Sequence, residues 1–442
     1  MIKSCQIIFS VILFTIFTGC GTDNTEKNVV GANFISSELI KEVNASTNLS
    51  YIKGSFKPDA TNAFNIKTVK IKYKTSDENG KSVVASGTLT IPTPTPQYTQ
   101  YLASVNKSFS ISTILENHGT IFTNAEAPTN SIMNLGSATQ SMELLMSGYS
   151  GFAVIMPDYL GYGDSNSSHH PYILKKSSAN VSIDMLKASV RYMTDNDIVF
   201  NGQVYVSGYS EGGFVAMAVA EELEKNYASE FQIKGLAAMA GPYDVESLGI
   251  IEVNATRTMQ YPAFLAYLTQ AYANQYSDIN LSEVIIYPNH EVFNTLFNGN
   301  LSGPAINVAL GFGNGTNTFG FKSHTADKLW KTTLINDFAN INNNFRVRLS
   351  QNNVYNWTPK TKVNLIHCID DEIIPFSMSQ TAYDKFISNG MTSNNLTLSP
   401  IPTASLTQQV DAFNPFVHGN CGSTAYGAAV TWFDKIRSGE IK

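Results

Sequence analysis

One serine in the chain lies in the pattern that a nucleophilic serine requires. The segment Gly208-Tyr209-Ser210-Glu211-Gly212 is the only G-x-S-x-G among the 442 residues. Glycines on both sides allow the serine to occupy a strained turn between a strand and a helix, with its hydroxyl group exposed at the edge of a sheet. Residues 204–207 predict that strand, and residues 212–225 predict that helix. Ser210 is therefore the candidate nucleophile.

A serine hydroxyl group needs a histidine as general base and a carboxylate that orients the histidine. Candidates for both follow Ser210 in the chain. Residues 363–369 predict a buried strand that ends in Asp370-Asp371-Glu372-Ile373-Ile374-Pro375. Open α/β sheets place their sites at the carboxyl ends of strands, so the acid is Asp370 or Asp371. His418 is the candidate base, and we expect it on the loop before the last helix.

The elements around these residues indicate an α/β protein. Residues 69–75 and 82–91 alternate in polarity on either side of Asp77-Glu78-Asn79-Gly80, which is typical of a β-hairpin. Beyond residue 96, strands alternate with helices, which predicts crossovers and a mainly parallel sheet. The other expected strands are 110–116, 152–156, 204–207, 233–239, 363–369 and one near Leu396, and the expected helices are 137–149, 178–193, 212–225, 377–388 and one through residues 425–436.

Residues 244–360 are too many for a crossover between the strands that flank them, so we expect an insertion there. Its first part is rich in aromatic residues, which include Tyr261, Phe264 and Tyr267. We interpret it as a partly helical lid or cap that supplies an apolar wall for an acyl chain. A cap that only packs its own small core would fit the same composition.

Further motifs are His118-Gly119-Thr120, the segment 157–163 and Gly241-Pro242-Tyr243-Asp244. With the serine, acid and histidine segments, they resemble the α/β hydrolase superfamily, and most of all secretory lipases and related bacterial esterases, over residues 66–436. The resemblance implies an α/β-hydrolase fold, with a mostly parallel twisted sheet flanked by helices and a lid or cap insertion before the acid-bearing strand. It also favours Asp371 as the acid, because the acid commonly stands in a D-x-x-[VI]-P motif.

Attack by a serine creates an oxyanion that needs positioned donors, usually the N–H group after the nucleophile and one from the loop after the third strand. We assign the backbone N–H groups of Glu211 and Thr120 to this oxyanion hole, with Gly119 as the alternative to Thr120. His118 should order that loop.

Three other sites carry titratable groups for which chemistry is the less favoured interpretation. Asp158 is expected to be a structural hydrogen-bond anchor. Asp244 is an alternative acid, because some relatives take their acid from a neighbouring strand. His169 and His170 are interpreted as turn residues.

The N-terminus is typical of an exported protein. A short segment with a positive charge, residues 1–3, is followed by an apolar run at residues 7–17. This run is too short to span a bilayer but suitable for a signal peptide. Phe17-Thr18-Gly19-Cys20 resembles a bacterial lipobox, which implies a signal peptide over 1–19 and a lipid anchor on Cys20, at the outer membrane or cell surface. A plain signal peptide is the alternative. Residues 20–50 are interpreted as a flexible tether.

Cys368 and Cys421 are the cysteines left once Cys5 and Cys20 are assigned to the N-terminal segment. Disulfides persist in an exported protein, so we expect a bond between them that ties the acid loop to the histidine loop. Two free buried thiols are the alternative.

The charge composition of the chain argues against one class of function. A net charge of -6 without a basic run argues against nucleic-acid binding. The predicted protein is a serine carboxylic ester hydrolase for hydrophobic or lipid esters, with a catalytic domain over 51–243 and 361–442 and the insertion at 244–360. No metal or organic cofactor is expected, and the oligomeric state is not predicted. A serine peptidase and a non-catalytic surface lipoprotein are the alternatives.

Overall fold

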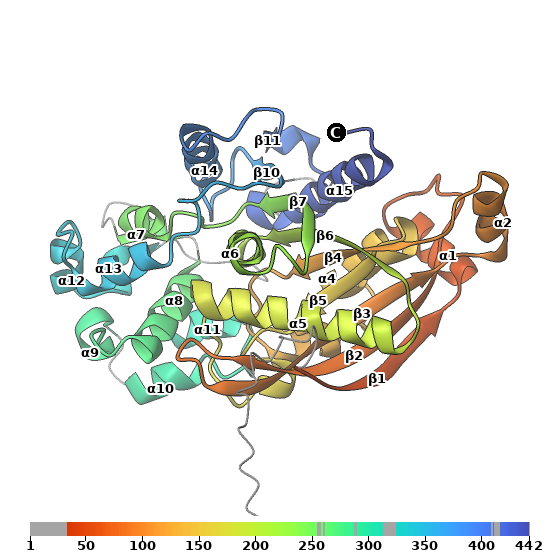
Figure 1. The fold of residues 1–442 in the computed structure, drawn as a ribbon. Helices are drawn as coiled ribbons and strands as arrows, with labels where there is room; N and C mark the ends of the chain where they lie inside the picture. Colours follow the sequence, from red (N-terminus) through yellow and green to blue (C-terminus); the bar gives the residue numbers. More distant parts are fainter. Residues whose placement is uncertain are drawn as a thin grey trace, which may run out of the picture.

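A computed structural model of the chain describes residues 33–253, 258–259, 261–286, 290–312, 324–407, 410 and 416–441. Its centre is a nine-stranded sheet in the order β1-β2-β3-β5-β4-β6-β7-β10-β11 (Figure 1). The first three strands and β5 pair in antiparallel fashion, and the six strands from β5 to β11 pair in parallel. The strands are β1 (Phe34–Val43), β2 (Asn65–Ser76), β3 (Ser82–Thr93), β4 (Ile111–Asn117), β5 (Ala153–Pro157), β6 (Phe200–Tyr209), β7 (Gln232–Met239), β10 (Lys362–Cys368) and β11 (Leu396–Ile401).

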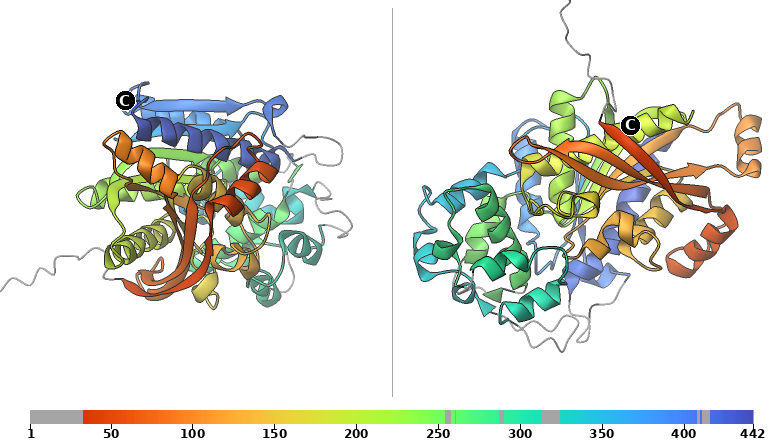
Figure 2. Two further views of the ribbon diagram at one scale, coloured as in Figure 1. Left: turned by 90° about the vertical axis from the view of Figure 1, so that its right-hand side faces the viewer. Right: turned by 90° about the horizontal axis from the view of Figure 1, so that it is seen from below.

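Helices cover both faces of this sheet (Figures 1 and 2). Helices α5 (Lys175–Asp195) and α6 (Glu211–Asn226) pack on one face, where Ile183, Leu186 and Val219 are buried. Helix α15 (Val417–Ser438) packs on the other, where Phe433 is buried in a second cluster. Strands that are covered on both faces have sequences with continuous apolar runs. The predicted mostly parallel sheet flanked by helices is confirmed.

The segment between β7 and β10 is largely helical and lies to one side of the sheet (Figure 1). Its helices are α7 (Val245–Val253), α8 (Pro262–Gln275), α9 (Leu281–Val284), α10 (His290–Thr295), α11 (Gly303–Ala309), α12 (Thr332–Asp337) and α13 (Asn344–Gln351), and the short strands β8 (Thr258–Met259) and β9 (His324–Thr325) pair with each other. The remaining α-helices are α1 (Ala45–Ser55), α2 (Pro96–Ser104), α3 (Pro128–Ser131), α4 (Ala138–Glu143) and α14 (Ser377–Ser388).

The prediction of a flexible tether is wrong for residues 34–50, because these residues form β1 and the first half of α1. Strand β1 is an edge strand that pairs with β2, and most of its side chains are exposed. Its register shifts between Phe34 and Ser36 and again between Leu39 and Lys41. These irregularities interrupt the alternation by which an edge strand is recognised in a sequence.

The predicted lipid-bearing Cys20 and the signal segment lie outside the described residues. Within the part of the chain that the structure describes, no helix is long and apolar enough to span a membrane.

Candidate active site

Ser210 stands at a strained turn between β6 and α6. Its backbone has φ 61° and ψ −122°, which a residue with a side chain rarely adopts. The flanking glycines are required by close backbone approach: a Cβ atom on Gly208 would lie 2.1 Å from the carbonyl oxygen of Gly212, and one on Gly212 would lie 1.9 Å from that of Asn117. The turn that the G-x-S-x-G pattern predicts is therefore present.

The structure brings Ser210, His418 and Asp371 together from three distant segments. The hydroxyl oxygen of Ser210 lies 2.9 Å from Nε2 of His418, and Nδ1 of His418 lies 2.6 Å from Oδ2 of Asp371. A carboxylate can only accept, so Nδ1 carries a hydrogen and Nε2 is left to accept the serine proton. This arrangement can generate a serine nucleophile.

Asp371 is held in place by its own loop. Its Oδ1 accepts hydrogen bonds from the backbone N–H groups of Ile373 and Ile374, at 3.0 and 2.8 Å. Nε2 of His367 lies 3.3 Å from Oδ2. Burial alone would raise the pKa of Asp371, but His418 and His367 hold that pKa below its ordinary value. The carboxyl group is therefore ionised beside the imidazole.

His418 lies in the first turn of α15, and the prediction that it stands on a loop is wrong. Glu372 explains where the helix begins, because its Oε2 accepts hydrogen bonds from the N–H groups of Val417 and His418, at 3.1 and 3.2 Å. The first N–H groups of a helix have no partner within the helix, so a carboxylate there favours helix formation. The hydroxyl group of Tyr209 also donates to the carbonyl oxygen of His418, at 2.6 Å.

The structure contains the predicted disulfide bond between Cys368 and Cys421, with their Cα atoms 6.1 Å apart. Cys368 ends β10, and Cys421 lies in α15. Both are fully buried. The bond joins the acid-bearing strand to the histidine-bearing helix.

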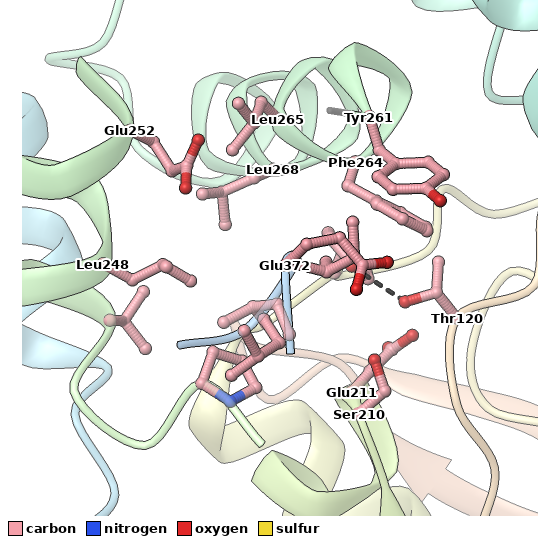
Figure 3. Close-up of a pocket in the computed structure, with 16 residues that line it drawn as sticks. Thr120, Ser210, Glu211, Leu248, Glu252, Tyr261, Phe264, Leu265, Leu268 and Glu372 are labelled. Carbon is pink, nitrogen blue, oxygen red and sulfur yellow. Dashed lines mark hydrogen bonds between the residues drawn. The ribbon is translucent and has the colours of Figure 1, made fainter. Parts of the chain in front are cut away.

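The predicted oxyanion loop passes directly beside the nucleophile. A Cβ atom on Gly119 would lie 3.1 Å from the carbonyl oxygen of Tyr209 and 3.6 Å from Cβ of Ser210. Thr120 lines the same pocket as Ser210 and Glu211 (Figure 3). Glu211 opens α6, where backbone N–H groups have no partner within the helix.

The alternative acids lie in other hydrogen-bond networks. Asp370 accepts from Thr403, at 2.6 Å, and Asp244 accepts from the N–H and hydroxyl groups of Ser247 near the start of α7, at 3.1 and 2.7 Å. Asp158 is buried and accepts from Thr129, at 2.8 Å to both its N–H and hydroxyl groups, which is the geometry of an anchor. His118 forms a 2.8 Å hydrogen bond with the carbonyl oxygen of Gly119 and lies within the oxyanion loop.

A sequence-family comparison agrees with this geometry: the model of the secretory lipases matches residues 130–441. The chain belongs to the secretory lipase family. The family makes the protein a hydrolase of the lipase and esterase kind, which implies ester substrates, and its secretory character agrees with the predicted export. No curated protein matches the chain in sequence.

Solved structures with the α/β-hydrolase fold are similar to this chain. The rice cell wall degrading esterase LipA from Xanthomonas oryzae has a TM-score of 0.77 at 22% identity, with 93% of this chain and 99% of that chain covered. A Legionella pneumophila protein described as a hydrolase has a TM-score of 0.75 at 20% identity, with 91% of this chain and 98% of that chain covered. Candida antarctica lipase A in its closed state has a TM-score of 0.56 at 15% identity, with 91% of this chain and 92% of that chain covered.

An apolar pocket of about 690 Å³, counting its open mouth, begins at Ser210. Leu265 and Leu268 project into it from α8, Leu248 lines it from α7, and Glu252 lies at the end away from Ser210 (Figure 3). The aromatic residues of the insertion are divided. Tyr261 and Phe264 line this pocket, whereas Tyr267 is buried against other rings, among them that of Tyr172.

The sequence alone assigns no role to two buried carboxyl groups, those of Glu116 and Glu211. Glu116, on β4, is 2% exposed and accepts hydrogen bonds from the hydroxyl groups of Ser207 and Tyr426. Burial raises the pKa of Glu116 to about 8. Glu211 is also 2% exposed, and its Oε1 lies 2.7 Å from Nε2 of His170.

His170 does lie at a turn, since its carbonyl oxygen accepts a hydrogen bond from the N–H group of Tyr172 at 2.9 Å, but its side chain is buried, which the turn interpretation did not predict. The adjacent aromatic and glycine-rich segment was the available signal, but His-Pro sequences are also typical of turns. Within the described part of the chain, no group of three or more His, Cys, Asp or Glu side chains could hold a metal ion.

Proposed function

We propose that the protein is a serine carboxylic ester hydrolase that acts through an acyl-enzyme on Ser210. The observation that carries the proposal is the continuous contact from the Ser210 hydroxyl group through both ring nitrogens of His418 to the carboxylate of Asp371, at 2.9 and 2.6 Å. Glu211 and Thr120 line the same pocket as Ser210, and in this proposal their backbone N–H groups stabilise the tetrahedral intermediate.

In the proposed reaction, the Ser210 oxygen attacks the carbonyl carbon of the ester as its proton passes to Nε2 of His418. The carbonyl oxygen becomes an oxyanion that accepts hydrogen bonds from the N–H groups of Glu211 and Thr120, or of Gly119 in place of Thr120. His418 then gives the proton to the departing alcohol, which leaves an acyl ester on Ser210. Water releases the acid by the same steps, and the proton returns to Ser210.

The pocket favours hydrophobic or lipid esters. Its lining is mostly apolar and includes Val245, Leu248, Phe264, Leu265 and Leu268. An acyl chain bound there loses contact with water, which stabilises binding by about 0.8 kcal/mol for each buried CH₂ group. In this proposal the insertion at residues 244–360 is the cap of the active site.

The test uses purified protein that lacks residues 1–20. It should release p-nitrophenol from acyl esters, Ser210→Ala should abolish the release, and Ser104→Ala, on the exposed face of α2, should retain it. Activity equal to the wild type in Ser210→Ala would contradict the mechanism. A fluorophosphonate that labels Ser210 separates an enzyme from an inert binding protein, and a matched panel of amides separates an esterase from a peptidase.

The N-terminal sequence supports a membrane anchor as a second part of the proposal. We infer that Cys20 becomes the lipidated first residue of the mature chain and holds the domain at the outer membrane or cell surface. Cells fed an alkyne-bearing fatty acid should label the wild-type protein but not Cys20→Ala. Absence of label from a correctly processed wild-type protein would indicate a plain signal peptide.

A further inference from the structure

The structure assigns a positioning role to His170: we propose that it holds the two sides of the oxyanion hole in register. One side is the N-terminus of α6, where Glu211 follows the nucleophile. The other is the loop of residues 118–121. The inference rests on the proposed serine hydrolase function and deepens it.

His170 is fixed to the first side by a buried pair. Its Nε2 lies 2.7 Å from Oε1 of Glu211, and its Nδ1 lies 2.8 Å from the carbonyl oxygen of Leu160. A carbonyl oxygen can only accept a hydrogen bond, so Nδ1 carries a hydrogen and donates it to Leu160. Nε2 is the ring nitrogen that contacts Glu211. The main chain approaches closely as well, because a Cβ atom on Gly161 would lie 2.6 Å from the backbone nitrogen of His170.

The same imidazole is surrounded by tyrosines that reach the second side. The ring centroids of Tyr159, Tyr162 and Tyr172 lie 5.9, 5.1 and 6.0 Å from that of His170. Each hydroxyl group contacts the oxyanion loop: Tyr159 donates to the carbonyl oxygen of His118 at 3.1 Å, Tyr162 donates to that of Ile121 at 2.6 Å, and Tyr172 lies 2.8 Å from the hydroxyl oxygen of Thr120.

Two physical effects follow from this arrangement. Oxyanion donors act only when they lie within hydrogen-bond distance of the developing charge, so an error in the separation of the two sides weakens the site. In addition, a Glu211 carboxylate without a partner would be costly to bury and would repel the oxyanion that forms beside it. Pairing with His170 offsets both penalties.

The experiment compares His170→Phe, which keeps an aromatic ring in the cluster, with His169→Phe, the same change at an exposed neighbouring residue. We expect His170→Phe to lower kcat by about 10- to 100-fold with little change in KM, somewhat less than removal of a whole oxyanion donor costs. The inhibition constant of a trifluoromethyl ketone, whose adduct carries an oxyanion, should rise by the same factor. His169→Phe should leave both quantities unchanged.

Two further variants separate positioning from general stability. Glu211→Gln combined with His170→Phe should recover part of kcat, because no buried charge is left without its partner. Tyr172→Phe, which removes only a hydroxyl group, should lower kcat several-fold even if His170→Phe does not fold. Active-site counting with a fluorophosphonate corrects every value for unfolded protein.

Unchanged kcat in His170→Phe or in Tyr172→Phe would overturn the inference, and so would a loss of kcat without weaker binding of the ketone. A wild-type protein that neither hydrolyses esters nor reacts with the fluorophosphonate would instead refute the proposed function. An active wild type, an inactive Ser210→Ala and a fully active His170→Phe would refute the positioning role alone.

Discussion

Cys368 and Cys421 each lie three residues from a member of the proposed triad, Cys368 before Asp371 and Cys421 after His418, and they are bonded to each other. The bond spans 53 residues of sequence. It therefore acts on the two residues whose mutual distance decides whether the histidine can work as a base.

We predict that the double variant Cys368→Ser/Cys421→Ser loses about 2–4 kcal/mol in the free energy of unfolding, because the unfolded chain is no longer constrained by the bond. The kcat should also fall, since the bond no longer joins α15 to the acid-bearing strand and the position of His418 then depends more on its hydrogen bonds with Asp371 and Glu372. Urea unfolding and ester hydrolysis measure the two effects. Wild-type protein treated with a reductant serves as the control, and a double variant as stable as the oxidised wild type would contradict the prediction.

The pH dependence of kcat/KM should show one ionisation above the ordinary imidazole value of 6.5. Burial would lower the pKa of His418, but Asp371 overrides burial and raises it. Only the neutral imidazole accepts the serine proton, so activity is lost as the pH falls through this raised pKa. The measurement is a pH profile with a soluble ester.

Asp371→Asn is the matching control for the pH profile, because it removes the charge and keeps the shape. It should lower kcat by about 10⁴-fold, and the ionisation seen in the residual activity should shift to lower pH. An unshifted ionisation would mean that a group other than His418 controls the rate.

The three residues of the proposed triad, which the structure brings together, could be proposed from the sequence because their signals are local. The glycines around Ser210, the acid cluster after a buried strand and the histidine near the start of the last helix are each visible within about ten residues. Most strands of the sheet were visible as well, because strands buried on both faces are continuous apolar runs.

Pairings between distant segments could not be predicted in the same way. The partner of β1 is a strand that starts more than 20 residues later, and the bulges in β1 conceal its alternation. The contact between His170 and Glu211 spans 41 residues, because it joins a loop residue to the first residue of α6, and the two meet only in the folded chain. A histidine before a proline is typical of a turn, and the sequence does not show whether its side chain is buried.

The pocket predicts how acyl-chain preference can be changed. Leu268 is 8% exposed and lines the pocket from α8. Leu268→Trp should shorten the space and lower kcat/KM for decanoyl esters by at least about tenfold, a cost of 1–3 kcal/mol for an overfilled site, with little effect on acetyl esters. Val308→Trp, at an exposed position of α11, is the control. An equal loss for both esters would indicate that the acyl chain binds elsewhere.

The raised pKa of Glu116 predicts that this residue makes the folded protein less stable as the pH rises. Burial raises its pKa to about 8 from the ordinary 4.5, so the folded protein keeps a proton that the unfolded chain releases. The contribution of Glu116 to the stability of the folded state is complete below pH 4.5 and decreases between about pH 4.5 and 8, by an amount on the order of several kcal/mol.

Glu116→Gln should remove this pH-dependent loss, because an amide keeps the hydrogen-bonding shape without a titratable proton. We expect the melting temperature of the variant to exceed that of the wild type at pH 8 and to approach it at pH 5. If the melting temperatures of the two proteins differed by the same amount at every pH in this range, Glu116 would not titrate as described.

Strand β1 also decides where the chain can be cut. Its ladder covers the outer edge of β2 from Ile66 to Tyr73, and β2 is a long strand with buried apolar residues. A truncation that began after residue 43, as a tether would suggest, would leave the N–H and C=O groups of β2 open to pairing with another molecule. Such a protein is expected to self-associate and precipitate, so a soluble form for the assays above has to begin no later than Asn33.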